Sequence, residues 1–111
     1  MKITARQSGN VTILDLDGKI TIGSGDQALR DAIHQQMQGE KRDLLLNAKK
    51  VTTIDSSGVG ELVAAYTTVT NRGGKLKLLN LPPKLSDILQ ITQLITVFEV
   101  YDNEDEAIKS F

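Results

Sequence analysis

The residues with the clearest chemical potential are Asp55, Ser56 and Ser57, a carboxylate followed by two hydroxyls. An apolar run ends at Asp55, and the spacing of the residues after it predicts an amphipathic helix. A serine in the first turn of a helix lies at the positive end of the helix dipole, where free N–H groups bind phosphate well. The pattern therefore predicts a site of serine phosphorylation and does not indicate a catalytic centre. The predicted apolar face of the helix is formed by Val59, Leu62, Val63, Tyr66 and Val69.

Two glycines, Gly58 and Gly60, fall in the first turn of this predicted helix. Helix capping by Asp55, Ser56 or Ser57 would account for one polar residue, at about 1 kcal/mol. It does not account for two hydroxyls, nor for two glycines that each cost about 0.5–1 kcal/mol in a helix. Close packing is one explanation for the glycines. The other is that they leave the backbone bare for a phosphate or a second protein. The residues alone favour capping and close packing, and we favour the second explanation only because of the family resemblance of this segment.

Catalysis by these serines would need a base, and the sequence offers none. The Gly-x-Ser-x-Gly pattern of a nucleophile elbow fails because Ile54 stands two residues before Ser56. His34 is the only histidine; it is expected to be exposed on a helix, without the serine and acid of a triad. Asp15–Gly18 resembles the opening of a calcium loop but lacks the later ligands, which favours a strand end with a turn glycine. We expect no catalytic residue, no metal site and no cofactor.

The chain has 111 residues, the length of one domain, and a formal net charge of −1. This charge balance gives no indication of nucleic-acid binding. The absence of cysteine excludes disulfides, thiolate zinc sites and a cysteine nucleophile. No apolar run approaches the ~18 residues of a membrane helix, and the N-terminus lacks a signal-peptide pattern. We expect a cytoplasmic protein without direct membrane insertion.

Hydrophobic periodicity and turn residues predict one α/β domain over residues 1–111. A strand–helix–strand unit of the predicted length implies parallel neighbours. We therefore expect an N-terminal hairpin and a mixed, mostly parallel sheet with about four α-helices packed against it. The predicted strands are Lys2–Arg6, Val11–Asp17, Asp43–Asn47, Lys75–Asn80 and Val97–Tyr101. The predicted helices begin at Ser24 or Asp26, at Ser57, at Pro82-Pro83 and at Asp102 or Asn103, and the first two end near Met37 and Asn71.

The segment Asp55–Gly60, Asp-Ser-Ser-Gly-Val-Gly before a helix, resembles the STAS domain, and more narrowly the bacterial anti-sigma-factor antagonists. The resemblance extends through the order of the elements over nearly the whole chain. It implies a small switch protein that, when unphosphorylated, binds an anti-sigma factor with serine kinase activity and so releases a sigma factor. The kinase then phosphorylates the first serine after the aspartate, which corresponds to Ser56, and a separate serine phosphatase reverses the step.

The same resemblance implies where the partner binds and where this chain departs from its relatives. Many relatives carry a Gly-Glu-Leu-Asp type segment near the phosphoacceptor, whereas Gly18–Thr21 here reads Gly-Lys-Ile-Thr. This departure bears on the choice of partner and leaves the acceptor serine unchanged. The implied partner surface is the switch loop and helix start, Asp55, Ser56, Ser57, Gly58, Val59, Gly60 and Glu61. On or near the outward face of the helix we expect Glu61, Thr67, Asn71 and Arg72, as partner contacts or simply as a solvated face.

Two other functions remain open at the level of sequence. A STAS module can act as a scaffold or partner-binding module in a stress-signalling assembly or a lipid-transport complex; the short segment before the first strand weighs against a sensor-bearing scaffold. A small hydrolase that uses Ser56 is the third possibility and lacks an identifiable base. Co-purification separates the three, because each predicts a different result: a kinase-like anti-sigma factor, a transporter or large assembly, or turnover without a partner.

Overall fold

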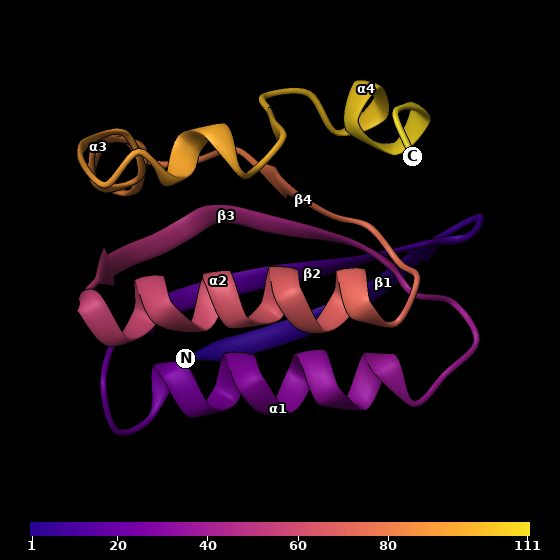
Figure 1. Cartoon of the computed structure of the whole chain (residues 1–111), viewed down its shortest axis with the longest axis horizontal. Coiled ribbons are helices and arrows are strands. Elements are labelled where there is room, and N and C mark those ends of the chain that lie inside the picture. Colours follow the sequence, from indigo (N-terminus) through magenta and orange to yellow (C-terminus); the bar gives the residue numbers. More distant parts are fainter.

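The computed structural model describes residues 1–111 and contains one five-stranded sheet flanked by helices (Figure 1). A short 3-10 turn, η1 (Leu94–Thr96), lies between the third helix and the last strand. The strands are β1 (Lys2–Ser8), β2 (Val11–Ile20), β3 (Asp43–Ile54), β4 (Leu76–Leu79) and β5 (Val100–Tyr101). The helices are α1 (Gly25–Met37), α2 (Ser56–Asn71), α3 (Pro83–Ile91) and α4 (Glu104–Lys109).

The order of the strands in the sheet follows their order in the chain, β1-β2-β3-β4-β5. β1 and β2 form an antiparallel hairpin, with Gly9 in the left-handed conformation (φ +59°) at its turn. Every later pair of neighbours is parallel and is therefore connected by a helix that crosses over the sheet. Consequently the carboxyl ends of β2, β3, β4 and β5 meet at one edge, and the segments that follow these strands gather there.

The two faces of the sheet are covered unequally. Alternation along β3 sends Leu44 and Leu46 to one face and Leu45 to the other. The first face is covered by α1, α2 and α3, of which α1 and α2 lie side by side (Figure 1). The opposite face is covered by α4. The larger core has 18 buried residues, among them Leu29, Ile33, Leu62, Val69, Leu85 and Leu89. The smaller core is Val11, Ile13, Leu45, Leu79 and Ala107.

The structure confirms the predicted α/β class, the hairpin, the parallel neighbours and the helices, although α2 begins one residue before the predicted Ser57. It corrects the bounds of several strands, among them β2, which continues past Asp17 to Ile20. β3 continues to Ile54 and does not end at Asn47, because its second half pairs with β2 as far as Ile20 although it is partly polar. The predicted strand Val97–Tyr101 is reduced to the two residues of β5, because Val97 is in the helical conformation (φ −81°, ψ −39°) that ends η1. None of the helices has the length and apolar character that crossing a membrane requires.

Candidate functional site

Asp55 joins the end of β3 to the start of α2 and also holds the loop that follows β2. Its backbone is extended (φ −112°, ψ −174°), and it is the N-cap residue of α2. The N–H of Gly58 donates to its Oδ1 at 2.9 Å, and the N–H of Ile22 donates to its Oδ2 at 3.0 Å. These bonds, the one from Ile22 foremost, lower the pKa of the Asp55 carboxyl. The carboxylate thus fixes the loops after two neighbouring parallel strands relative to each other.

Ser56 is the first residue of α2, and it is exposed. Because Asp55 supplies the cap, the hydroxyl of Ser56 is not needed to satisfy the free amides of the first turn. No acidic residue occupies that turn, so no side chain of the helix itself compensates the positive end of its dipole. Ser57, the next residue, is half-buried. The structure therefore presents the Ser56 hydroxyl at a position that favours negative charge.

Gly58 and Gly60, which the sequence analysis treated alike, have different environments. A Cβ on Gly58 would lie 2.0 Å from the carbonyl oxygen of Ile20 and 2.7 Å from Cγ1 of Ile54, so this buried glycine is required by the close packing of α2 on the sheet. A Cβ on Gly60 would meet no atom within 4 Å, and the residue is exposed. The close-packing explanation therefore applies to Gly58, and the bare backbone that we favoured is found at Gly60.

Glu61 turns toward α1, which corrects the expected outward orientation of this side chain. It is 13% exposed, and its Oε1 accepts a hydrogen bond from Nε of Arg30 at 3.0 Å. This contact raises the pKa of Arg30 and pairs the two helices. Val59 is half-buried, and His34 is exposed on α1 as expected. The other residues expected on the outward face are exposed: Thr67, Asn71 and Arg72.

Ile22, in the loop between β2 and α1, is a candidate that the sequence pattern missed. It is 74% exposed, and its N–H is bonded to the carboxylate of Asp55, so it lies beside the start of α2. Its neighbours Gly23 and Ser24 are exposed and small. A single large apolar residue in a glycine- and serine-rich turn is the signal that could have identified it. It gives the surface near Ser56 an apolar contact point.

The departing segment Gly18–Thr21 forms the end of β2 and leads into this loop. Ile20 is buried in the larger core, whereas Lys19 is exposed and pairs in register with Thr53 of β3. Lys19 therefore places a positive charge at the end of β2, at a position where the Gly-Glu-Leu-Asp type segment has an acidic residue.

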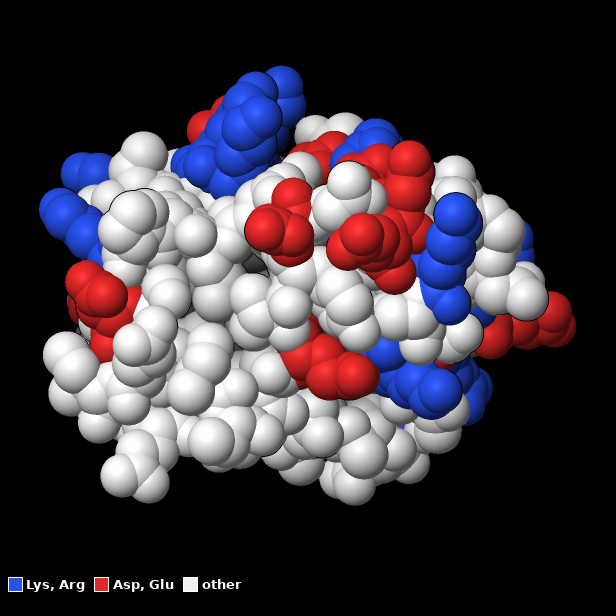
Figure 2. All heavy atoms as spheres, turned by 90° about the horizontal axis from the view of Figure 1, so that it is seen from above, with Lys and Arg blue, Asp and Glu red and all other residues white.

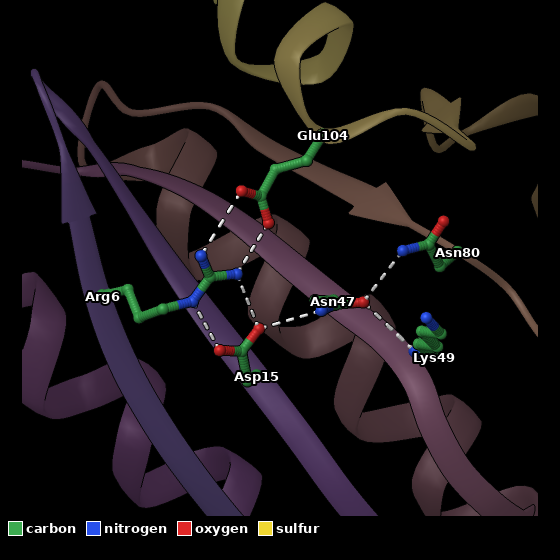
Figure 3. A network of polar contacts seen from close by, with 6 residues as sticks. All are labelled: Arg6, Asp15, Asn47, Lys49, Asn80 and Glu104. Atoms are coloured by element: carbon green, nitrogen blue, oxygen red, sulfur yellow. Dashed lines mark hydrogen bonds and ion pairs between the residues drawn. The ribbon is translucent and has the colours of Figure 1, made fainter.

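A second polar cluster lies on the opposite face of the sheet (Figure 3). Arg6 donates from Nε to Asp15 Oδ2 at 2.6 Å and from Nη2 to Glu104 Oε1 at 2.6 Å. Asn47 donates to Asp15 Oδ1 at 2.9 Å and accepts from the side chain of Asn80 at 3.4 Å. Arg6 holds the pKa of Asp15 below its ordinary value. The polar groups of this cluster are hydrogen-bonded to one another and connect the hairpin to α4. Asp15 of β2 therefore serves as the ion-pair partner of Arg6.

This chain is similar to known proteins in sequence and in fold over most of its length. A family model described as STAS domain matches residues 2–107. The chain is 22% identical over 108 residues to the anti-sigma F factor antagonist of Paenibacillus polymyxa, covering 97% of this chain and 92% of that protein. It is 28% identical over 100 residues to the anti-sigma-B factor antagonist of Bacillus subtilis (strain 168), covering 90% of each. The solved structure of the Bacillus cell fate determinant SpoIIAA in the phosphorylated form is similar in fold, with a TM-score of 0.76, 22% identity and coverage of 98% of both chains.

Proposed function

Because this chain belongs to the STAS domain family, we propose that it is an anti-sigma-factor antagonist switched by phosphorylation of Ser56. The unphosphorylated form binds an anti-sigma factor with serine kinase activity in the cytoplasm and so releases a sigma factor. Phosphate on Ser56 abolishes the binding, and a serine phosphatase restores it. The observation that carries the proposal is the exposed Ser56 at the start of a helix that Asp55 already caps.

The relatives support the general role. Two curated relatives are named as antagonists of anti-sigma factors, and each match covers at least nine-tenths of both proteins. One relative of the same fold was solved in a phosphorylated form, which supports phosphorylation as the modification. In this role the chain itself catalyses no reaction, since the phosphoryl transfer belongs to the partner kinase.

The switch is electrostatic. A phosphate on Ser56 adds about −1.5 to −2 charges at pH 7. The domain tolerates this charge, because the first turn of α2 lies at the positive end of the helix dipole and contains no acidic residue besides the Asp55 cap that precedes it. A partner packed over Ser56 would have to desolvate the phosphate. A penalty of about 3 kcal/mol is enough to weaken binding about a hundredfold.

The proposed partner surface has an accessible part and a supporting part. Ser56, Gly60 and Ile22 are exposed, and the open space at Gly60 lets a partner backbone approach α2 closely. Lys19 is exposed on the strand end that leads to Ile22, so a partner that reaches this strand end would meet a positive charge. The other residues of the switch loop position the surface from beneath: Asp55, Ser57, Gly58, Val59 and Glu61.

The site of modification is tested by mapping the phosphate. The protein is incubated with its cognate kinase and ATP, and the phosphate is located by fragmentation mass spectrometry. We expect phosphate on Ser56 in the parent and in Ser57→Ala, and none in Ser56→Ala. Phosphate on Ser57 alone, or undiminished labelling of Ser56→Ala, would show that the wrong residue has been assigned.

Binding is tested by calorimetric titration against the anti-sigma factor. Ser56→Asp should weaken the affinity about tenfold or more, and Ser56→Ala should bind as the parent does. Ile22→Ser should also weaken binding, whereas Ile91→Ser, at an exposed position at the end of α3, is the matched control. If Ser56→Asp binds as tightly as the parent, negative charge at this position is not the switch.

A further inference from the structure

Strand β1 forms one margin of the sheet and has a neighbouring strand on one side only. All seven of its residues pair with β2, and no other strand pairs with it. None of the backbone hydrogen bonds outside the helices and strands involves β1. The opposite margin, β5, has only the two residues Val100 and Tyr101, and so short a strand is a poor template for further pairing. β1 is therefore the long free edge of the sheet.

The direction of the backbone groups of β1 follows from the hydrogen bonds of β2. The carbonyl oxygens of Gly18 and Ile20, two residues apart in β2, both accept hydrogen bonds from the side of β3. Backbone groups alternate in direction along a strand, so the odd-numbered residues of β2 point toward β1. These residues pair with the even-numbered residues of β1. The N–H and C=O groups of Ile3, Ala5 and Gln7 therefore point away from β2, to the free edge.

The free edge is accessible to a second strand. Five of the seven residues of β1 are exposed, among them Ala5, although its partner in β2, Leu14, is buried in the larger core. A cation on an edge strand normally discourages pairing with another chain. The cation Arg6, however, is held by Asp15 and Glu104 at 2.6 Å each, and these carboxylates compensate its charge.

Pairing of β1 with the β1 of a second copy has one register that avoids opposing charges. A two-fold axis perpendicular to the sheet makes the two strands antiparallel and keeps opposite side chains on the same face. The register centred on Ala5 pairs all seven residues. It places Arg6 opposite Thr4 of the second copy, and it places Lys2 opposite Ser8.

The neighbouring registers that also join outward-facing backbone groups are less favourable. A shift in one direction places Arg6 opposite Lys2 of the second copy, and a shift in the other places Arg6 opposite itself. Like charges directly opposite each other destabilise a pair of strands. The charges of β1 therefore select the register centred on Ala5.

The surface on the side of α3 is the other place where two copies could meet. Residues 88–98 contain no Lys, Arg, Asp or Glu, and Ile91 is 82% exposed. Seen from above α3 and α4, a broad area at the lower left carries no charged side chain (Figure 2). Much of the segment is helical, so its backbone groups bond within the segment and do not orient a second copy. The observations therefore favour β1 over this surface.

We propose that β1 is the interface of a homodimer, in which two copies of the chain join their sheets edge to edge. Ala5 pairs with Ala5 of the second copy, and Ile3 pairs with Gln7. Each of these pairs exchanges two hydrogen bonds, so the two sheets become one continuous sheet. Neither Ser56 nor Ile22 lies on β1, so each copy keeps the partner surface proposed for it.

The first test is sedimentation equilibrium of the whole chain at concentrations up to about 2 mM, where a weak interface is populated. We expect the mass to rise from one chain to two, with a dissociation constant of about 0.1–1 mM. Over the same concentrations, hydrogen exchange of isotope-labelled protein should slow at the amides of Ile3, Ala5 and Gln7. The even-numbered amides of β1 are bonded to β2 in both states and should not change. The proposal is overturned if the mass stays that of one chain, or if a dimer forms without slower exchange at these three amides.

Substitutions at Thr4 test the register. Thr4→Lys places a second cation opposite Arg6 at two symmetric positions and should weaken the dimer about tenfold. Thr4→Glu places an acid there and should strengthen it about threefold or more. The same two changes at Thr53, an exposed threonine of β3, are the matched controls and should leave the dissociation constant unchanged. If Thr53→Lys weakens the dimer as much as Thr4→Lys, or if Ile91→Ser abolishes it, β1 is not the interface.

Discussion

Helices α2 and α4 both begin with a side-chain cap, but they differ in the residues of their first turns. This difference distinguishes the proposed modification site at α2 from a purely structural contact at α4. Asp55 accepts the N–H of Gly58 at 2.9 Å, and Asn103 accepts the N–H of Glu106 at 3.0 Å, so each helix has a side-chain cap. The first turn of α2 has no acidic residue. That of α4 has three, Glu104, Asp105 and Glu106.

The consequence is that α4 uses its own carboxylates where α2 leaves space for an added anion. Glu104 is bonded to Arg6 of the hairpin, so the start of α4 is joined to the sheet by an ion pair. At α2 the residue in the first position is the exposed Ser56. Capping alone therefore does not indicate function. What indicates it at α2 is an exposed hydroxyl in a first turn that holds no acidic residue, beside a cap that already satisfies one amide of that turn.

The largest effect is expected from Gly58→Ala, which challenges the packing beneath the start of α2. The new Cβ would lie 2.0 Å from the backbone oxygen of Ile20, and a backbone atom cannot move aside cheaply. We expect a loss of about 3 kcal/mol or more in the free energy of unfolding, measured by chemical denaturation. Gly60→Ala is the control, because its Cβ meets open space; it should be neutral or stabilising by up to about 1 kcal/mol. Equal losses in both variants would contradict the assigned packing.

This pair of glycines also shows how far the sequence could predict the site. The motif predicted the helix start, the exposed serine and the need for glycine, because these depend on residue type and local spacing. It could not distinguish Gly58 from Gly60, because that difference depends on how closely α2 approaches Ile20, which is distant in sequence. The inward turn of Glu61 escaped prediction for the same reason, since its partner Arg30 lies on another helix.

The fold was predictable to a similar degree. Alternating and buried apolar runs predicted the hairpin and the parallel strands. The second half of β3 was missed because its polar residues lack an apolar pattern and are held in the sheet by pairing with β2. The last strand was overpredicted because Phe98 and Val97 have strand-forming side chains, while the chain at Val97 is still in the helical conformation that ends η1.

The second-largest effect concerns the contact between β4 and the C-terminal end of α4. Lys77 is 3% exposed; its Nζ donates to the carbonyl oxygen of Ser110 at 2.8 Å and lies 4.8 Å from the ring centre of Phe111. Lys77→Met keeps the volume and leaves that carbonyl without its partner, so we expect a loss of about 2 kcal/mol. Hydrogen exchange should accelerate in α4 and stay unchanged in α2. Lys75→Met, at an exposed position two residues before Lys77, is the control. If exchange in Lys77→Met accelerates equally in α2 and α4, Lys77 does not act locally on α4.

The third effect is the response of the start of α2 to acid. The pKa of Asp55 is lowered by the N–H groups of Ile22 and Gly58, so its stabilisation is present above about pH 4 and is lost as the pH falls through the lower folded value. Asp55→Asn removes the charge, so its thermal midpoint should fall less than that of the parent on acidification below about pH 4. Asp15, whose pKa Arg6 lowers, titrates in both proteins, so the difference between the two profiles isolates Asp55. Parallel profiles would show that the Asp55 charge does not stabilise the loop.

The smallest effect tests the comparison of α2 with α4 most directly. The substitution Ser56→Asp gives the first turn of α2 an acidic residue, of which the first turn of α4 has three. Ser56→Asp should raise the free energy of unfolding by about 0.3–1 kcal/mol, since the exposed carboxylate lies at the positive end of the helix dipole without being buried. Asp105→Ser makes the reverse change in the first turn of α4 and should lower it by no more than a similar amount. Both differences should shrink in high salt, because they arise from exposed charges. If Ser56→Asp instead destabilises the domain at every salt concentration, the hydroxyl is structural, and the two helix starts differ in packing and not in their capacity to accept a charge.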